Sequence, residues 1–331
     1  MKLIIIGATG LVGNELLKIL DKVNLSNFEK VQLIASQFSK GKVINFQGNK
    51  LSIQTWEDID FSQKNIFINC SSSELALKIC KEIENTVSIL IDNSSALRLN
   101  PKIPLVVPHI NYPESKDNLF ANPNCSTIIL SCLLNPLKNF GFERIVVSTY
   151  QAASGAGKEG LEELELQMKE YSNKEKLTTN FWKKQYVGNC FVHNSSLTDK
   201  HYNTEEMKLI NETKKIFNNP ELKITATCIR VPTIRSHCES VNIQFKNPIN
   251  YKQICDLLEE DENICLLDDK KLCNFPDTLV SSDKNEVYIG HIRPDYSLPE
   301  NIGWNFWISG DQILRGAAYN AFEILKKLKI D

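Results

Sequence analysis

The sequence predicts an α/β fold with two domains, one on a largely parallel sheet and one α+β domain with a mostly antiparallel sheet. Short apolar runs alternate with helical patterns through the first third of the chain, which is typical of βα units and a parallel sheet. Longer runs of alternating apolar and polar residues follow later, as expected for antiparallel strands. The length of 331 residues is sufficient for two such domains.

The N-terminal segment has the pattern of a dinucleotide-binding turn. Residues 2–6 predict a strand and residues 11–20 a helix, and Gly-Ala-Thr-Gly-Leu-Val-Gly lies between them. Gly7 suits a tight turn, Gly10 lets the backbone approach a pyrophosphate, and Gly13 allows close packing of helix on strand. The helix N-terminus then faces the phosphates. This context predicts a Rossmann-like domain rather than a plain βα turn.

The second predicted strand, residues 31–35, ends in a loop that bears on cofactor choice. In this fold an acidic residue here selects NAD, whereas hydroxyls and cations suit the 2′-phosphate of NADP. The loop contains Ser36, Ser39, Lys40 and Lys42 and no acid. It therefore favours NADP, although the same composition is typical of a solvated loop.

Further strands and a helix are expected before residue 110, and polar residues follow two of the strands. The predicted strands are 66–69, 87–91 and 105–107, with a helix at 74–83. Serines 71–73 either line a cofactor cleft or cap the helix, and capping is the simpler interpretation. Residues 92–98 end in Arg98 at a strand's carboxyl end, where open α/β sheets bind ligands.

A cysteine follows the rigid turn Ala-Asn-Pro-Asn and precedes an apolar helical pattern. Asn124 or Ser126 is a good N-cap, which places Cys125 in or beside the first turn of that helix. The helix dipole and unpaired N–H groups there favour the thiolate, which is the nucleophilic form. The alternative is a buried structural cysteine.

The second half predicts a sheet with covering helices. Its predicted strands are 144–150, 222–230, 239–245, 286–293 and 303–309, and its predicted helices are 161–171, 203–217 and 311–329. The loop from Arg230 to His237 is a plausible catalytic connection, although a lone histidine there is usually structural. The charged face of the helix 203–217, with Glu205 and Lys208, has the pattern of a solvated ion pair. Residues 172–200 are polar and irregular and are expected to cover the surface or a partner subunit.

Composition excludes several classes of function. A net charge of −2 with scattered lysines gives no sign of a nucleic-acid or membrane partner. The first apolar run is too short for a signal peptide or a membrane span. Ten cysteines without a Cys-x-x-Cys pair predict reduced thiols, no metal site and a cytoplasmic protein.

In order and spacing, these motifs resemble the aspartate-semialdehyde dehydrogenase family over nearly the whole chain. The motifs are the glycine-rich opening, Ser-Ser-Ala-Leu-Arg at 94–98, Asn-Pro-Asn-Cys-Ser-Thr at 122–127, Gln-Ala-Ala-Ser-Gly-Ala-Gly at 151–157, Glu-Glu-Met-Lys at 205–208, the segment 230–237 and the segment 311–320. The resemblance implies NADPH-dependent reduction of L-aspartyl 4-phosphate to aspartate 4-semialdehyde through a cysteine thioester, in lysine, threonine and methionine biosynthesis. It also implies a homodimer or a tetramer, with the small-molecule substrate and phosphate as ligands.

The resemblance implies roles for individual residues. Cys125 would be the nucleophile and His237 the acid/base group with an ordinary pKa, and Gln151 would orient the acyl group. Substrate would be bound by Arg98, Asn124, Glu205, Lys208 and Arg230. The cofactor would be bound by Gly7, Thr9, Gly10, Leu11, Val12, Ser36, Ser39, Lys40, Ser71, Ser154, Gly155 and Gln312. The predicted domains are 1–124, completed by 311–331, for NADP binding and 125–310 for catalysis and dimerisation.

Several positions depart from the family pattern. Phe38 stands where an arginine often lies in the cofactor loop, and Lys40 would replace it; Ser72 and Ser73 occur where glycines are common, and His291 replaces an arginine. Two alternatives stay open. An N-acetyl-glutamyl-phosphate reductase would share the cysteine and histidine but would not need Glu205 for an acetylated amine. A non-catalytic dinucleotide-binding redox sensor would keep the fold without a reactive thiol.

Overall fold

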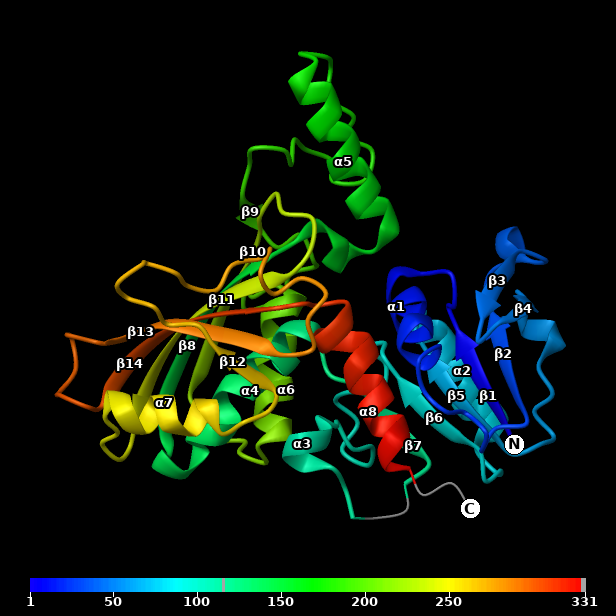
Figure 1. The fold of residues 1–331 in the computed structure, drawn as a ribbon, viewed down its shortest axis with the longest axis horizontal. Helices are drawn as coiled ribbons and strands as arrows, with labels where there is room; N and C mark the ends of the chain where they lie inside the picture. The colour runs from blue at the N-terminus through cyan, green and yellow to red at the C-terminus, as the bar shows by residue number, and fades with distance from the viewer. Residues whose placement is uncertain (115–116, 329–331) are drawn as a thin grey trace. The chain divides into compact units, whose positions relative to one another are not determined.

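The computed structural model describes residues 1–114 and 117–328. The chain divides into two compact units (Figure 1). Unit 1 comprises Met1–Asn124 and Ala317–Asp331, and unit 2 comprises Cys125–Gly316. Residues 329–331, with which both the last predicted helix and the completed first domain end, lie outside the described residues. No helix among the described residues is long and apolar enough to cross a bilayer.

Unit 1 is built on a parallel sheet in the strand order β2-β1-β5-β6-β7. The strands are β1 Lys2–Ile6, β2 Lys30–Ile34, β5 Asn65–Asn69, β6 Ile89–Asp92 and β7 Leu119–Ala121. Every adjacent pair is parallel. Nearly all residues of β1 and β5 are buried, which explains why their sequences are continuous apolar runs.

The helices of unit 1 bury their apolar faces against this sheet. They are α1 Leu11–Leu20, α2 Ser73–Ile83, α3 Pro108–Asn111 and α8 Asn320–Lys327, with short 3₁₀ turns η1 Gln37–Ser39 and η2 Trp56–Asp58. Leu16 and Leu20 of α1 and Ile324 of α8 join the core formed with the strands. The hydroxyl of Ser72 accepts a hydrogen bond from the Leu75 amide at 3.3 Å, so the capping interpretation is confirmed for that serine.

The predicted strand at 105–107 is wrong. Leu105 forms only an isolated bridge to Ala121. The strand that pairs with β6 is β7, which the sequence did not predict. Pro104 and Pro108 flank the segment, and neither can donate to a ladder. The hairpin of β3 Val43–Phe46 and β4 Asn49–Ser52 was also missed, although Gln47 and Gly48 at its turn both have positive φ.

Unit 2 contains a mixed sheet in the strand order β12-β13-β14-β11-β8-β10-β9. The strands are β8 Phe142–Gln151, β9 Phe191–Val192, β10 Ile224–Arg230, β11 His237–Phe245, β12 Ile264–Leu266, β13 Val287–Pro294 and β14 Gly303–Gly310. The β8–β10 and β12–β13 pairs are parallel and the other pairs are antiparallel. The predicted fold class is therefore confirmed in both units.

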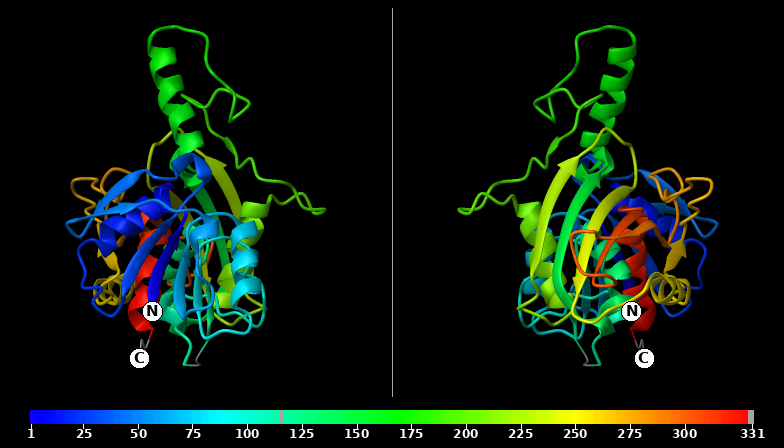
Figure 2. Two further views of the ribbon diagram at one scale, coloured as in Figure 1. Left: turned by 90° about the vertical axis from the view of Figure 1, so that its right-hand side faces the viewer. Right: turned by 90° about the vertical axis from the view of Figure 1, so that its left-hand side faces the viewer.

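One face of this sheet is covered by helices. The helices of unit 2 are α4 Cys125–Leu137, α5 Lys158–Ser172, α6 Thr204–Ile216 and α7 Tyr251–Glu259, with 3₁₀ turns η3 Lys138–Phe140 and η4 Ala153–Ala156. Side chains of α4, α6 and α7 form the main core with the strands. Helix α5 projects from the sheet (Figures 1 and 2). The irregular segment 172–200 contains β9 and packs Trp182 and Tyr186 into a small aromatic core with Leu164 of α5.

The predicted helix 311–329 begins later and is not uniform. A π-helix, η5, spans Leu314–Tyr319 and α8 follows it. The Asp311 carboxylate accepts from the amides of Ile313 and Leu314 at 3.0 and 2.9 Å, which holds the chain in a turn before the helix. The Gly316 amide donates to the Asp311 carbonyl at 2.9 Å, the i→i+5 spacing of a π turn.

Candidate active site

Three predicted site residues of unit 2 lie in one row across its sheet. Arg230 at the end of β10 is in register with Gln151 at the end of β8. Cys238 of β11 pairs with Tyr150, so His237 lies beside Gln151 one step further along. Paired residues present their side chains to the same face. The expected loop 230–237 is therefore shorter than predicted, because both of its ends belong to strands.

Cys125 is the first residue of α4, as the Asn-Pro-Asn turn predicts, and it is partly buried. The next residue, Ser126, accepts a hydrogen bond from Gln151 Nε2 at 3.1 Å. The Gln151 amide also donates to the Thr149 hydroxyl at 3.3 Å and lies 3.5 Å from Glu205 Oε1. Gln151 thus joins the row of the sheet to the helix terminus that carries the cysteine.

His237 is fully buried and neutral. Its Nδ1 accepts from the Ala152 amide at 3.0 Å, so the ring proton lies on Nε2, which has no hydrogen-bond partner among the described residues. Burial, followed by the nearby Arg230 charge, lowers the pKa of His237 to about 3. The expectation of an ordinary pKa is wrong, because that expectation took the histidine to be in a solvated loop. A Cβ on Gly155 would lie 2.9 Å from this ring, so glycine is required there.

Arg230 is buried with its guanidinium above the indole of Trp182. Its Nη1 donates to the Ala152 carbonyl at 3.0 Å, and its Cζ lies 5.6 Å from the Trp182 ring centroid. Arg230 is only 4% exposed, and its Nε has no hydrogen-bond partner among the described residues. A rigid cation with unused donors is suited to an anionic ligand.

The pair Glu205 and Lys208 is not the solvated pair that the helical pattern suggested. Glu205 is 6% exposed, and its Oε2 accepts from Lys208 Nζ at 3.1 Å. The capping box of Asn203 and Glu206 begins α6 at Thr204, so Glu205 lies in the first turn, where the helix packs on β10. The resemblance predicted a functional Glu205 where the pattern alone did not.

Sequence reasoning missed several polar residues around this row. His193 lies in the irregular segment, where no periodicity marks it, and burial followed by the Arg230 charge lowers its pKa to about 4. Glu239 is fully buried two residues after His237. An acid in an alternating strand has no sequence signal for facing inward. Only the register of the sheet identifies Glu239 and Thr149 as neighbours.

A cavity of about 440 Å³ in unit 1 lies at the carboxyl ends of β1, β2 and β5. It is lined by Ile6, Gly7, Thr9, Gly10, Ile34, Ala35, Ser36, Gln37, Thr55, Trp56, Glu57, Cys70, Ser71 and Leu75. Five of the residues predicted to bind the cofactor are among them. A Cβ on Gly13 would lie 2.2 Å from the Gly7 carbonyl oxygen, as its predicted packing role requires. The glycines in its lining and its place at the carboxyl ends of parallel strands fit the phosphates of a dinucleotide.

The other cofactor-binding candidates lie outside the lining of this cavity. Leu11 and Val12 begin α1. Ser39 is buried in η1, and Lys40 Nζ lies 3.8 Å from an Asp58 carboxylate oxygen. Phe38, which stands where an arginine was considered, is 95% exposed. Arg98 and Asn124 also belong to unit 1 and are buried; Arg98 donates to the Asn93 carbonyl at 2.7 Å.

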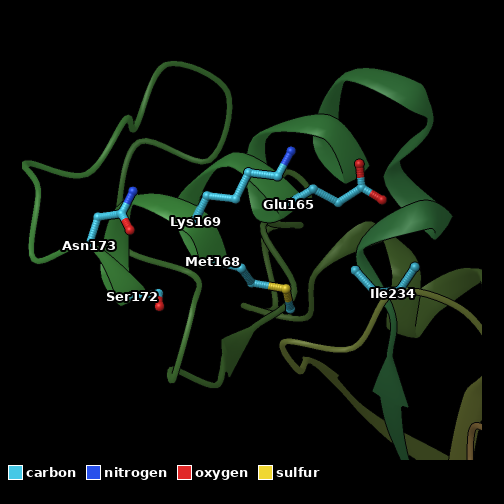
Figure 3. Close-up of a pocket in the computed structure, with 6 residues that line it drawn as sticks. All are labelled: Glu165, Met168, Lys169, Ser172, Asn173 and Ile234. Atoms are coloured by element: carbon cyan, nitrogen blue, oxygen red, sulfur yellow. The ribbon is translucent and has the colours of Figure 1, made fainter.

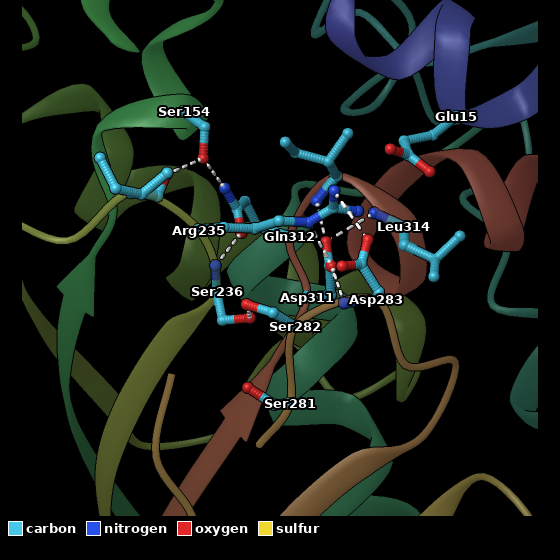
Figure 4. A network of polar contacts seen from close by, with 12 residues as sticks. Glu15, Ser154, Arg235, Ser236, Ser281, Ser282, Asp283, Asp311, Gln312 and Leu314 are labelled. Carbon is cyan, nitrogen blue, oxygen red and sulfur yellow. Dashed lines mark hydrogen bonds and ion pairs between the residues drawn. The ribbon is translucent and has the colours of Figure 1, made fainter. Parts of the chain in front are cut away.

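Ser154 and Gln312 are hydrogen-bonded to each other within unit 2 (Figure 4). Gln312 Nε2 donates to the Ser154 hydroxyl at 2.6 Å, and Gln312 Oε1 accepts from the Ser236 amide at 2.8 Å. Ser236 has a left-handed backbone, with φ +67°. The adjoining Arg235 bonds to the fully buried Asp311 carboxylate at 2.6 Å. This network holds the residue that precedes His237.

A separate hollow of about 740 Å³ lies along α5 (Figure 3). It is lined by Glu165, Met168, Lys169, Ser172, Asn173 and Ile234. None of these is a predicted site residue, so the hollow does not belong to the row described above.

Comparison with known proteins gives consistent matches over the chain. Residues 2–118 match the semialdehyde dehydrogenase NAD binding domain and residues 134–315 the semialdehyde dehydrogenase dimerisation domain. The aspartate-semialdehyde dehydrogenases of Prochlorococcus marinus and Bacillus subtilis are 38% and 36% identical, with 99% and 98% of this chain and 96% of each relative covered. A crystal structure of aspartate semialdehyde dehydrogenase II from Vibrio cholerae, complexed with ASA, has a TM-score of 0.92 at 36% identity, covering 98% of this chain and 97% of that one.

Proposed function

Because the chain belongs to the aspartate-semialdehyde dehydrogenase family, we propose that it reduces L-aspartyl 4-phosphate to L-aspartate 4-semialdehyde with release of phosphate. The observation that carries this proposal is the row of His237, Gln151 and Arg230 joined through Ser126 to the helix that begins at Cys125. A nucleophile, a hydrogen-bond donor and a cation for a carboxylate are what covalent acyl transfer from this substrate requires.

Cys125 is the proposed nucleophile. Its place at the first residue of α4 favours the thiolate. Sulfur attacks the acyl carbon, the carbon–oxygen bond to phosphate breaks, and phosphate leaves with the electron pair. The product on the enzyme is a thioester, which accepts hydride more readily than an acyl phosphate does. Gln151, held by Ser126 and Thr149, orients the acyl group.

His237 is the proposed proton carrier at the acyl oxygen. In the free protein its neutral ring offers an Nε2–H that has no other partner among the described residues. That Nε2–H can donate a hydrogen bond to the oxyanion that forms when the thioester carbon becomes tetrahedral, and the ring stays neutral. Full proton transfer requires the imidazolium form, and negative charge on the bound substrate favours that form by raising the pKa of His237 from its low value in the free protein.

Charged side chains are the proposed substrate-binding groups. Arg230 would bind the substrate carboxylate through its unused guanidinium donors, and Glu205 would accept from the substrate amine. Lys208, one-third exposed, and Arg98 would bind phosphate. The Glu205 carboxylate already pairs with Lys208; a charged free amine can be a second donor to it, whereas an acetylated amine carries no charge.

The protein has an NAD(P)-binding domain, and we propose NADP as its cofactor. When bound, the cofactor supplies hydride to the thioester carbon. Gly7, Thr9, Gly10, Ser36 and Ser71 line the cavity that would hold it. The absence of an acid at the end of β2 and the cations at Lys40 and Lys42 support a 2′-phosphate.

A homodimer and a cytoplasmic location are proposed with this activity. The dimerisation-domain match covers most of unit 2, which supports self-association through that unit. Light scattering of the purified chain tests this, and a monomer at micromolar concentration would contradict it. None of the ten cysteines, all of which are described in the structure, forms a disulfide, as is typical of a reducing compartment.

The test is an absorbance assay in the oxidative direction. Aspartate semialdehyde and phosphate are supplied with NADP or NAD, and phosphate-dependent reduction of NADP is expected. Comparable use of NAD would widen the cofactor assignment. Activity on N-acetylglutamate semialdehyde alone would contradict the proposed substrate.

A further inference from the structure

We propose that Glu239 is a neutral carboxylic acid that acts as a positioning residue, supporting Gln151 and the N-terminus of α4 through Ser126. The inference deepens the proposed function, because it depends on the roles given to Gln151 and Cys125. It concerns a residue for which the sequence offered no role.

Glu239 and Thr149 form the cross-strand pair two residues along β11 and β8 from His237 and Gln151. In the register of the sheet, Glu239 also pairs with Ile308 of β14. Thr149 and Ser126 are the two hydroxyls to which the Gln151 amide donates. Glu239 is therefore a neighbour of the hydroxyl groups that hold Gln151, on a strand that α4 packs against.

The surroundings of Glu239 do not suit a carboxylate ion. The residue is 0% exposed, and neither carboxyl oxygen has a hydrogen bond of ordinary geometry among the described residues. Its neighbours Ile308 and Val241 are apolar, and the Ser126 hydroxyl is the donor near enough to favour the charged form. A buried carboxylate needs several donors or a cation, whereas a neutral acid needs far less.

The charged and titratable groups on the elements around Glu239 are Cys125 on α4, Cys228 and Arg230 on β10, Glu205 and Glu206 on α6, and His237 and Cys238 on its own strand. Of these, the Cys228 and Cys238 thiols interact electrostatically with Glu239. None of the charged side chains makes an ion pair with Glu239 among the described residues. Burial raises the pKa of Glu239 well above its ordinary value, against a smaller opposing effect of Ser126.

A neutral acid has a chemical advantage at this position. A carboxylate ion near Ser126, the residue that follows Cys125, would disfavour the thiolate and repel an anionic substrate. The carboxylic acid instead gives the Ser126 hydroxyl a polar neighbour without adding charge. Glutamine has the same shape and the same neutral state, so it should replace glutamic acid here.

The experiment compares the wild-type full chain with Glu239→Gln and Glu239→Leu. For Glu239→Gln we expect kcat within about threefold of wild type, and for Glu239→Leu a fall in kcat of about 10- to 100-fold with little change in substrate KM, because Gln151 loses its support. A kcat of Glu239→Gln as low as that of Glu239→Leu would overturn the proposal.

Two further measurements do not depend on catalysis. The folded chain holds a proton on Glu239 that the unfolded chain releases above about pH 4.3. Wild-type stability is therefore lost as pH rises, and the unfolding equilibrium constant of wild type relative to Glu239→Gln should rise up to tenfold per pH unit in urea titrations. The infrared band of a protonated carboxyl group should also disappear in Glu239→Gln.

Glu163→Gln is the matched control for these measurements. The Glu163 carboxylate is buried but accepts from the amides of Phe181 and Trp182 at 2.5 and 2.9 Å, so its loss should lower stability. A pH-independent stability difference for Glu239→Gln, or an unchanged infrared band, would overturn the neutral state. If the chain lacked the proposed activity, the urea titrations and the infrared band would still test whether Glu239 is neutral.

Discussion

The two candidate sites of this protein are built in different ways. The cofactor cavity of unit 1 is formed around one βα turn, where Gly7, Thr9 and Gly10 follow β1 within a few residues. The row in unit 2 brings together residues from β8, β10 and β11 that are far apart in the chain. The first site depends on backbone geometry and the second on strand register.

This difference determines which changes each site should tolerate. A side-chain substitution in the row removes a chemical group but leaves the cavity in the other unit untouched. Binding of the cofactor and the chemistry of the acyl group should therefore respond separately to substitution.

The largest expected effect is that of Cys125→Ala. Turnover should fall at least about 1,000-fold, because no other group is placed to form the thioester. The dissociation constant for NADPH, measured by calorimetry, should stay within about twofold of wild type. Substantial turnover in this variant would contradict the covalent mechanism, and a lost NADPH affinity would contradict the separation of the two sites.

Arg230→Leu should have the next largest effect. Removal of a buried cation that pairs with a ligand carboxylate typically costs 2–5 kcal/mol, so substrate KM should rise by about 30-fold or more. NADPH affinity should change little. Arg144→Leu is the control, because Arg144 is an exposed arginine near the start of β8, the strand that pairs with β10. Similar KM values for both variants would remove Arg230 from substrate binding.

Local motifs of the sequence predicted turns and helix termini in both units well, and the pairing of distant strands less completely. The glycine-rich turn, the Ser72 cap and the Cys125 helix terminus are each determined by adjacent residues. The pairing of Arg230 with Gln151 joins segments about eighty residues apart, and no local pattern encodes it. Glu239 could not be assigned to the inner face without that register.

The missed elements have similar physical causes. β7 is three residues long, too short for a periodic signal, and the apolar segment 105–107 forms only an isolated bridge to it. The charged pattern of α6 looked solvated because its sequence could not show that β10 packs on Glu205. Tertiary packing, rather than local preference, decided both cases.

His237→Asn tests the electrostatics of the row without cofactor or substrate. Because the folded pKa is lowered to about 3, stability is fully present above the unfolded value of about 6.5 and is lost as pH falls toward 3. The unfolding equilibrium constant of wild type should rise up to tenfold more per pH unit than that of the variant over this range. Urea titrations from pH 6.5 to 4.5 measure this difference.

The control for that measurement is His201→Asn, because His201 is exposed in unit 2. His193 has the same sign as His237, with a pKa of about 4, so His193→Asn should give a smaller part of the same effect. Parallel stability profiles for wild type and His237→Asn would mean that His237 is not neutral in the folded chain.

The smallest expected effect concerns the cavity of unit 1. Glu57 lines it beside Ser36 and Gln37, and bonds from its own backbone amide and from Thr55 lower its pKa, so it is ionised at neutral pH. That charge opposes the 2′-phosphate that Lys40 would attract. Glu57→Gln should therefore raise the affinity for NADP relative to NAD by about 2- to 5-fold, since exposed charges interact weakly.

Quenching of tryptophan fluorescence can measure both affinities, because Trp56 lines the same cavity. Glu29→Gln, at an exposed position of unit 1, is the control for net charge. An unchanged NADP:NAD ratio in Glu57→Gln would mean that the ribose end of the cofactor lies away from this carboxylate. A selective gain would make Glu57, rather than the lost arginine at Phe38, the residue that weakens NADP preference in this chain.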